Sequence, residues 1–105
     1  MPTVPELFQW MPDRYLKGKL NTTRTFYFSI DNHKYTVTMT PDDVQVESGK
    51  TRDQCDVVLK TTEKIFLRMV VDGNMPGALD IARGKIKTND VSGLEGLKDL
   101  FDFSR

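Results

Sequence analysis

Residues 65–87 read IFLRMVVDGNMPGALDIARGKIK, and this stretch gives the clearest indication of the fold. Residues 65–71 are nearly all apolar and predict a helix. Pro76 suits the first turn of a second, shorter helix, and residues 85–87 predict a short basic strand that leads to a leucine-rich C-terminal helix. Together these segments carry more apolar helical surface than one face of a small sheet requires, which indicates either a tight core or the lining of a cavity.

Upstream of this stretch, apolar and polar residues alternate, as they do in strands with one buried face. Three strands are expected, over residues 24–30, 34–39 and 44–47. The turns between them are expected at residues 31–33 and 40–43, where Asp, Asn and Pro tolerate the turn backbone. Three strands joined by tight turns predict an antiparallel meander.

One more strand and two more helices complete the predicted order. Residues 56–60 contain three consecutive apolar residues and predict a strand covered on both faces. An N-terminal helix is expected over residues 5–15, where Pro12 would kink it or end it early. The final helix is expected to begin after Asn89 or Asp90 and to continue to the C-terminus. Its apolar residues at helical spacing are Leu94, Leu97, Leu100 and Phe101.

These elements predict the α+β class, in which helices cover one face of a five-stranded, mixed, mostly antiparallel sheet. The chain has 105 residues and is expected to form a single domain over residues 1–105. Hydrophobic residues make up 38% and charged residues 29%, which is ordinary for a globular domain.

The charges of the chain balance. Lysine and arginine number 15, as do aspartate and glutamate, so the net charge is zero. This balance gives no large basic field, and it argues against generic nucleic-acid binding and against a polybasic membrane anchor. Lys85 and Lys87 are expected on a solvated face; the alternative is that they steer a carboxylate or a CoA phosphate.

Four features favour a cytoplasmic location. Cys55 is the single cysteine, which suits a reducing compartment. The N-terminal residues have neither a positive leader nor an apolar core, so no signal peptide is expected. No run approaches the roughly 18 apolar residues that span a bilayer, and the C-terminal residues match no peroxisomal targeting tripeptide.

The sequence contains no recognisable catalytic motif. His33 is expected in a turn, and Cys55 as a buried structural thiol. Asp42 and Asp43 supply too few oxygen ligands for a metal site. Because a nucleophile–base pair, a metal cluster and a cofactor loop are all missing, we expect a non-enzymatic protein without a cofactor or metal.

The order of the elements resembles that of the sterol carrier protein 2 (SCP2) family, from about Phe26 to Phe101. The segment from Asp72 to Lys87 carries most of this resemblance, and residues 35–37 and 55–59 also look like family positions. The resemblance implies a five-stranded sheet with helices over one face that encloses a hydrophobic tunnel. It also implies the binding of a fatty acid, fatty acyl-CoA, phospholipid or sterol.

Residues on the predicted helices are candidates for the lining of this cavity. Ile65, Leu67 and Val71 are expected on the sheet side of their helix, with the remaining apolar side chains facing the lumen. Small residues leave volume unfilled, and methionines adapt to variable guests. The predicted lining residues are Phe66, Met69, Val70, Met75, Ala78, Leu79, Ala82, Leu97, Leu100 and Phe101. Phe8 and Trp10 are candidates for a flap; for both sets the alternative is ordinary core packing.

A second function class remains open. In a dimerisation or docking module, the same apolar face would pack on a partner protein instead of a lipid. The lipid hypothesis names a lipid or fatty acyl ligand as the partner, with no nucleic acid, and it is compatible with transient membrane contact and with a homodimer. A stable dimer that takes up no lipid would favour docking.

Overall fold

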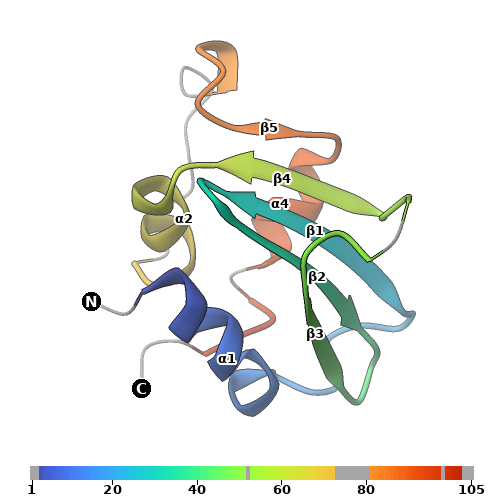
Figure 1. The fold of residues 1–105 in the computed structure, drawn as a ribbon. Coiled ribbons are helices and arrows are strands. Elements are labelled where there is room, and N and C mark those ends of the chain that lie inside the picture. Colours follow the sequence, from blue (N-terminus) through green and yellow to red (C-terminus); the bar gives the residue numbers. More distant parts are fainter. Residues whose placement is uncertain (1–2, 52, 73–80, 98, 103–105) are drawn as a thin grey trace.

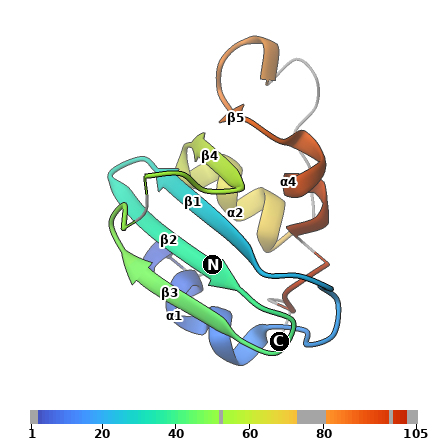
Figure 2. The same cartoon turned by 90° about the vertical axis from the view of Figure 1, so that its right-hand side faces the viewer.

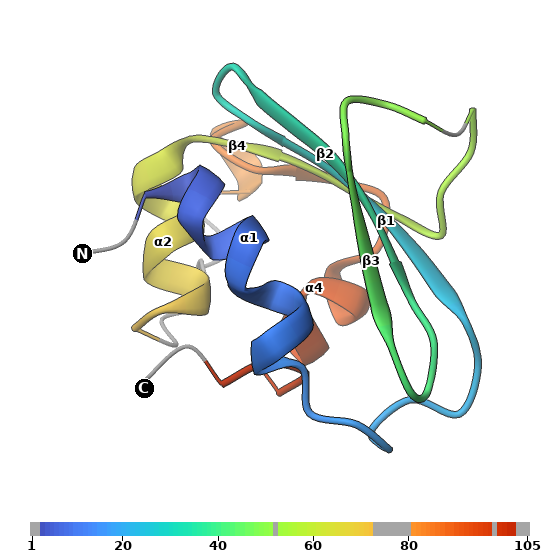
Figure 3. The ribbon, with the colours of Figure 1, turned by 60° about the horizontal axis from the view of Figure 1, so that its bottom comes forward.

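The computed structural model describes residues 3–51, 53–72, 81–97 and 99–102 (Figure 1). Three of its helices lie on one face of a sheet, and Figure 3 shows them together on that side. In chain order the elements are α1 (Val4–Arg14), β1 (Arg24–Ile30), β2 (His33–Met39), β3 (Val44–Ser48), β4 (Val57–Thr61), α2 (Glu63–Val70), β5 (Lys87–Thr88) and α4 (Val91–Leu97).

The five strands form one mixed sheet in the order β3-β2-β1-β4-β5. Figure 2 shows β3 and β5 at its two edges. β1 pairs with β4 in parallel, and the other three pairings are antiparallel. The predicted meander of β1, β2 and β3 and the predicted α+β class are therefore confirmed.

The core lies between the helices and the inner face of the sheet. On β1, the alternate residues Phe26, Phe28 and Ile30 are each at most 1% exposed. Phe28 meets Phe8 from α1 and Phe66 from α2, whose ring centroids lie 5.3 Å and 5.7 Å from its own. Burying each such ring contributes about 1.5–3 kcal/mol, so this aromatic cluster is a main source of stability.

Helix α1 continues through Pro12 to Arg14, so the expectation of an early end is wrong. Thr3 begins the helix with a capping box: its hydroxyl accepts from the Glu6 N–H, and the Glu6 carboxylate accepts from the Thr3 N–H. The helix also buries an apolar stripe, comprising Val4, Leu7, Phe8 and Met11. These contributions offset the one hydrogen bond that Pro12 removes, and its ring is exposed to solvent.

Helix α4 begins after Asp90, whose carboxylate accepts the Gly93 N–H at 3.0 Å. It ends at Leu97, so the expected continuation to the C-terminus is wrong. Beyond the helix the chain pairs with the end of α1. Tyr15 and Phe101 form an antiparallel bridge, and the Leu16 N–H donates to the Leu100 carbonyl at 2.8 Å. These tertiary hydrogen bonds replace those that a longer helix would make.

The last two strands also differ from expectation. Val57 and Leu59 are fully buried under the helices, but Val58 on the other face of β4 is only half-buried. The expected cover on both faces is therefore wrong, because the described helices pack on one face alone. Strand β5 is short, and Ile86, which was expected within it, is buried just before it begins.

Candidate functional site

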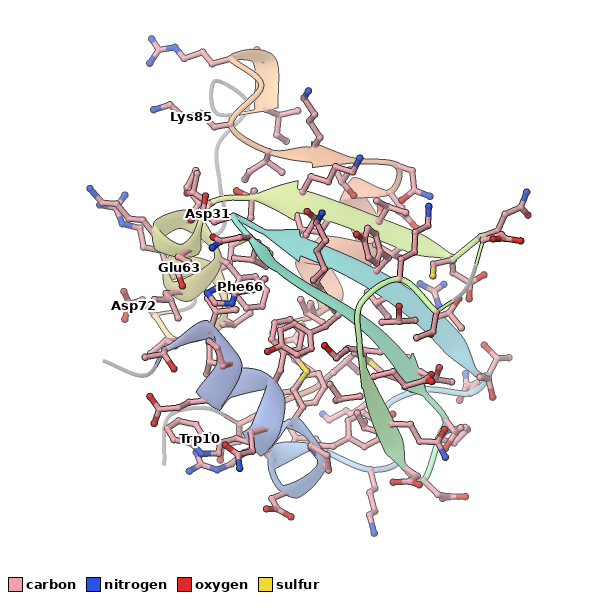
Figure 4. The ribbon with its side chains drawn as sticks, viewed as in Figure 1. Trp10, Asp31, Glu63, Phe66, Asp72 and Lys85 are labelled. Carbon is pink, nitrogen blue, oxygen red and sulfur yellow. The ribbon has the colours of Figure 1, made fainter. Side chains whose placement is uncertain are left out.

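Helix α2 buries the three residues that were predicted to line a cavity. Phe66, Met69 and Val70 are 0%, 1% and 7% exposed, and Figure 4 shows Phe66 on the side of α2 that faces the strands. Its ring lies against Phe28 of β1. The three residues expected on the sheet side, Ile65, Leu67 and Val71, are half-buried. Phe66 therefore faces the sheet, contrary to expectation, because its ring fills the space next to β1.

The two candidate flap residues lie in different surroundings. Phe8 is 1% exposed and stacks on Tyr35 of β2 with 4.1 Å between ring centroids. Trp10 is half-buried on the outer side of α1, away from the strands (Figure 4). The guanidinium carbon of Arg14 lies 5.0 Å from its ring centroid, a cation–π contact. Phe8 thus belongs to the core, and Trp10 is the more accessible of the pair.

The remaining predicted residues are spread along the chain. Met75, Ala78 and Leu79 lie outside the described residues, and Ala82 is exposed. Leu97 is 1% exposed, and Leu100 and Phe101 follow α4 at 7% and 5%. Of the predicted residues, Leu100 and Phe101 line a pocket.

This pocket has a volume of about 700 Å³ and lies between the start of β1, the segment after α1 and the end of α4. Its volume is within the range of roughly 300–1,000 Å³ that is usual for small-molecule sites. We call it the C-terminal pocket. It is lined by Leu16, Lys19, Leu20, Arg24, Phe26, Ser92, Gly93, Gly96, Asp99, Leu100, Phe101 and Asp102.

Two glycines on α4, Gly93 and Gly96, line one side of this pocket without side chains. A Cβ atom added at Gly96 would meet no atom within 4 Å, so the space beside it is open. A Cβ at Gly93 would lie 2.8 Å from Val57 Cγ2, because α4 packs closely on β4 there. The spacing of the two glycines places them one turn apart on the helix, and this spacing was visible in the sequence.

The lining combines apolar and charged groups. Its apolar part comes from Phe26, Leu100 and Phe101 with Leu16 and Leu20, while Lys19, Arg24, Asp99 and Asp102 carry charge. Such a lining can hold an apolar chain and leave a polar head near charged side chains. The sequence pattern did not predict the contributions of Leu16, Leu20 and Phe26, since only the fold brings them next to Leu100.

Tyr15 packs against Phe101, one of the residues that line the C-terminal pocket. Its hydroxyl donates a hydrogen bond of 2.6 Å to the Thr40 carbonyl, and its ring centroid lies 5.5 Å from that of Phe101. Burial, with the Asp42 carboxylate as the lesser cause, raises the pKa of Tyr15 above its ordinary value. The neutral phenol thus joins the end of α1, the turn before β3 and the C-terminal segment.

A second hollow, of about 460 Å³, lies on the outer face of the sheet. It is lined by Tyr27, Lys50, Asp53, Gln54, Cys55, Val58, Lys60 and Asn89. Cys55, which was expected to be buried, is half-buried here, because none of the described helices covers this face. Within the described ranges, no group of three His, Cys, Asp or Glu side chains is placed to hold a metal ion.

His33 occupies the first position of β2 rather than the turn. Its Nε2 atom lies 3.0 Å from Glu63 Oε1. The Asp31 carboxylate accepts the Glu63 N–H at 2.9 Å, and Figure 4 shows both acidic residues at the start of α2. These contacts join the hairpin to the helix N-terminus, and no local pattern in the sequence predicted them.

Comparison by sequence and comparison by structure gave different results. The sequence matches no protein-family model and no curated protein. In the part of the chain that the structure describes, no helix has the length and apolar character to cross a membrane.

Two solved structures share the fold at low sequence identity. UbiJ-SCP2, a ubiquinone synthesis protein, aligns with a TM-score of 0.63 and 11% identity over 94% of this chain and 91% of its own. The stereoselective inverting sec-alkylsulfatase Pisa1 from Pseudomonas sp. aligns with a TM-score of 0.72 and 17% identity over 91% of this chain. This chain spans 16% of the length of that enzyme. The chain therefore has an SCP2-like fold, as its order of elements predicted.

Proposed function

We propose that this domain is a non-enzymatic carrier that binds an amphiphilic lipid in the C-terminal pocket. The observation that carries the proposal is a pocket of about 700 Å³ whose apolar lining includes Phe26, Leu100 and Phe101. Burying an alkyl chain yields about 0.8 kcal/mol per methylene. A chain of about ten carbons therefore contributes several kcal/mol before the cost of ordering it.

The charged lining residues suit the polar end of such a ligand. Lys19 and Arg24 border the pocket on the side of the segment before β1, and both are exposed. A fatty acid or another lipid with an anionic head would place its charge there, in reach of solvent. The predicted contributions of Met75, Ala78, Leu79 and Ala82 remain part of this proposal, as does Trp10 as a flap residue.

The structural neighbours are consistent with an amphiphile. One is named as a sec-alkylsulfatase, and an alkyl sulfate joins an apolar chain to an anionic head. The other is named as a ubiquinone synthesis protein. Neither name identifies a ligand for this chain, and the class of lipid follows here from the lining of the pocket.

The test measures fatty-acid affinity by displacement of a fluorescent fatty acid. A Gly96→Leu change adds an apolar side chain into the open space of the pocket. We expect it to weaken binding at least tenfold, because the added side chain occupies the volume of the alkyl chain. Gln9→Leu, at an exposed position of α1, adds the same side chain elsewhere and is the matched control.

Unchanged affinity in Gly96→Leu would assign the lipid to another part of the molecule. Native mass spectrometry of the purified protein decides the broader question. A retained lipid supports the carrier function. A stable dimer that binds no fatty acid or acyl-CoA would instead favour the docking module.

A further inference from the structure

Lysines from three strands meet on the outer face of the sheet, the face opposite the helices. Ser29 of β1 pairs with Lys34 of β2 and with Lys60 of β4, and Lys60 pairs with Lys87 of β5. Directly paired residues project from the same face of a sheet. The three lysines therefore form one row around Ser29, and all three are exposed.

Lys50 joins this row from the loop that follows β3. Its Nζ atom lies 5.6 Å from the ring centroid of Tyr27. Tyr27 projects from the same face of β1 as Ser29, two residues away. We call this surface, made by Lys34, Lys50, Lys60 and Lys87, the lysine face.

The charge of the lysine face is not neutralised locally. Among the residues with described positions, none of the four lysines has a carboxylate at ion-pair distance. Asp53 lines the hollow beside Lys50 and Lys60, and Glu47 accepts from the Thr51 hydroxyl at 3.3 Å. Asp56, which precedes β4 on the same face, accepts the Thr25 N–H at 2.9 Å and is a third acid. Four lysines against these three acids leave the face positive in a chain whose net charge is zero.

We propose that the lysine face docks on the surface of an anionic lipid bilayer. Neighbouring strands lie about 4.8 Å apart, so Lys60 lies about 5 Å from Lys87 and about 10 Å from Lys34 across the sheet. Successive lysines of the row are therefore within about a Debye length of each other, and their charges add. Basic residues near an anionic leaflet each contribute to attraction without needing a shaped partner.

Other anionic partners fit this face less well. Stable protein interfaces are depleted in lysine and enriched in arginine and aromatic residues. Binding of single-stranded nucleic acid relies on exposed aromatic rings for stacking, and Tyr27 is only 7% exposed. The lysines are exposed and spread over several strands, and the Tyr27 ring among them is buried, so the face suits an extended anionic surface.

This docking goes beyond lipid uptake and does not require it, because the lysine face and the C-terminal pocket share no lining residue. The two proposals can therefore fail separately. Membrane docking is measured with vesicles, and chain binding with monomeric fatty acid.

The experiment measures co-sedimentation with vesicles of phosphatidylcholine that contain about 30 mol% phosphatidylserine, and with phosphatidylcholine alone. The test variant is Lys34→Gln/Lys60→Gln/Lys87→Gln. The control variant, Lys17→Gln/Lys64→Gln/Arg68→Gln, removes the same charge at exposed positions after α1 and on α2. Thermal unfolding establishes that each variant is folded.

We expect the wild type to prefer the anionic vesicles and to release when salt rises from about 50 to 200 mM. Each lysine removed from the face should weaken partitioning about fivefold, so the test variant should lose about a hundredfold and the control less than about threefold. If the triple variant does not fold, Lys34→Gln and Lys87→Gln are measured singly, each with the fivefold expectation.

Equal losses in the test and control variants would overturn the proposal, because net charge alone would then explain binding. Equal partitioning of the wild type into both kinds of vesicle would also overturn it. So would a wild type that ignores anionic vesicles, whether or not it binds polyglutamate or an oligonucleotide.

Discussion

The rings of Phe8 on α1 and Phe66 on α2 lie parallel, with centroids 5.6 Å apart and an angle of 2° between their planes. Both rings also contact Phe28 of β1. The two helices therefore meet each other and the sheet at one aromatic cluster. This contact joins two helices through residues that are 58 positions apart in the sequence.

The Phe8–Phe66 contact should be measurable as a coupling energy. Changing each ring to leucine, singly and together, defines a double-mutant cycle. We expect a coupling of about 0.5–1.5 kcal/mol in the free energy of unfolding, the usual contribution of an aromatic pair beyond its buried area. Denaturant titration measures it.

The matched control pairs Phe66→Leu with Tyr27→Leu, which lies on the other face of the sheet. That cycle should give a coupling within about 0.5 kcal/mol of zero. A coupling of the same size in both cycles would mean that the rings do not interact as the structure shows.

Thr36 and Thr38 on β2 should respond in opposite directions to the same change. The Thr36 hydroxyl donates to the Gly49 carbonyl at 2.7 Å and accepts from the Thr51 N–H at 3.1 Å. The Thr38 hydroxyl oxygen is buried and has no hydrogen-bond partner within the described part of the chain. Thr36→Val should therefore cost about 1–3 kcal/mol, and Thr38→Val should stabilise by about 1 kcal/mol.

Melting temperature distinguishes the two valine variants. For a domain of this size, 1 kcal/mol corresponds to a shift of about 4–8 °C. Thr36→Val should melt below the wild type and Thr38→Val above it. A drop in both would show that the Thr38 hydroxyl is satisfied in solution.

The two glycines of α4 should also differ. Gly93→Ala places a Cβ atom 2.8 Å from Val57 Cγ2 and should cost about 1–3 kcal/mol through overpacking. Gly96→Ala meets open space and should stabilise the helix by about 0.5–1 kcal/mol. Chemical denaturation compares the two variants, and Val57→Ala should partly restore the stability of Gly93→Ala. A neutral Gly93→Ala would contradict the close packing of α4 on β4.

Tyr15 should make stability fall at alkaline pH. Its pKa in the folded state is raised by burial and by Asp42, so the folded state holds the phenol proton more tightly than the unfolded state. The stabilisation is complete below the unfolded pKa of about 10. It is lost as pH rises from there through the folded pKa.

Tyr15→Phe isolates this effect from the titration of lysines. At pH 8 the variant should be less stable by about 0.5–1.5 kcal/mol, because the hydrogen bond to Thr40 is lost. The gap between wild type and variant should narrow above pH 10, as measured by denaturant titration at each pH. A constant gap would show that folding does not raise the pKa of Tyr15.

The order of the elements was predictable because it depends on local periodicity. Phe26, Phe28 and Ile30 alternate with polar neighbours, and this pattern alone indicates a strand with one buried face. The Asp90 cap of α4 was likewise a local signal. Expectations failed where tertiary contacts compete with local preference. Helix α1 continues past Pro12 because its apolar side is buried. Phe101 lies outside the last helix because its backbone pairs with Tyr15.

The positions of the first four strands and the amphipathic character of α1 and α2 followed from the residue pattern, since each depends on residues a few positions apart. Only the tertiary structure decided which of these faces meet. It placed Leu16 and Phe26 beside Leu100 to form a pocket. Through strand register it also collected Lys34, Lys60 and Lys87 on one face of a neutral chain. Long-range pairing sets these positions, because register, unlike periodicity, depends on which strand lies next to which.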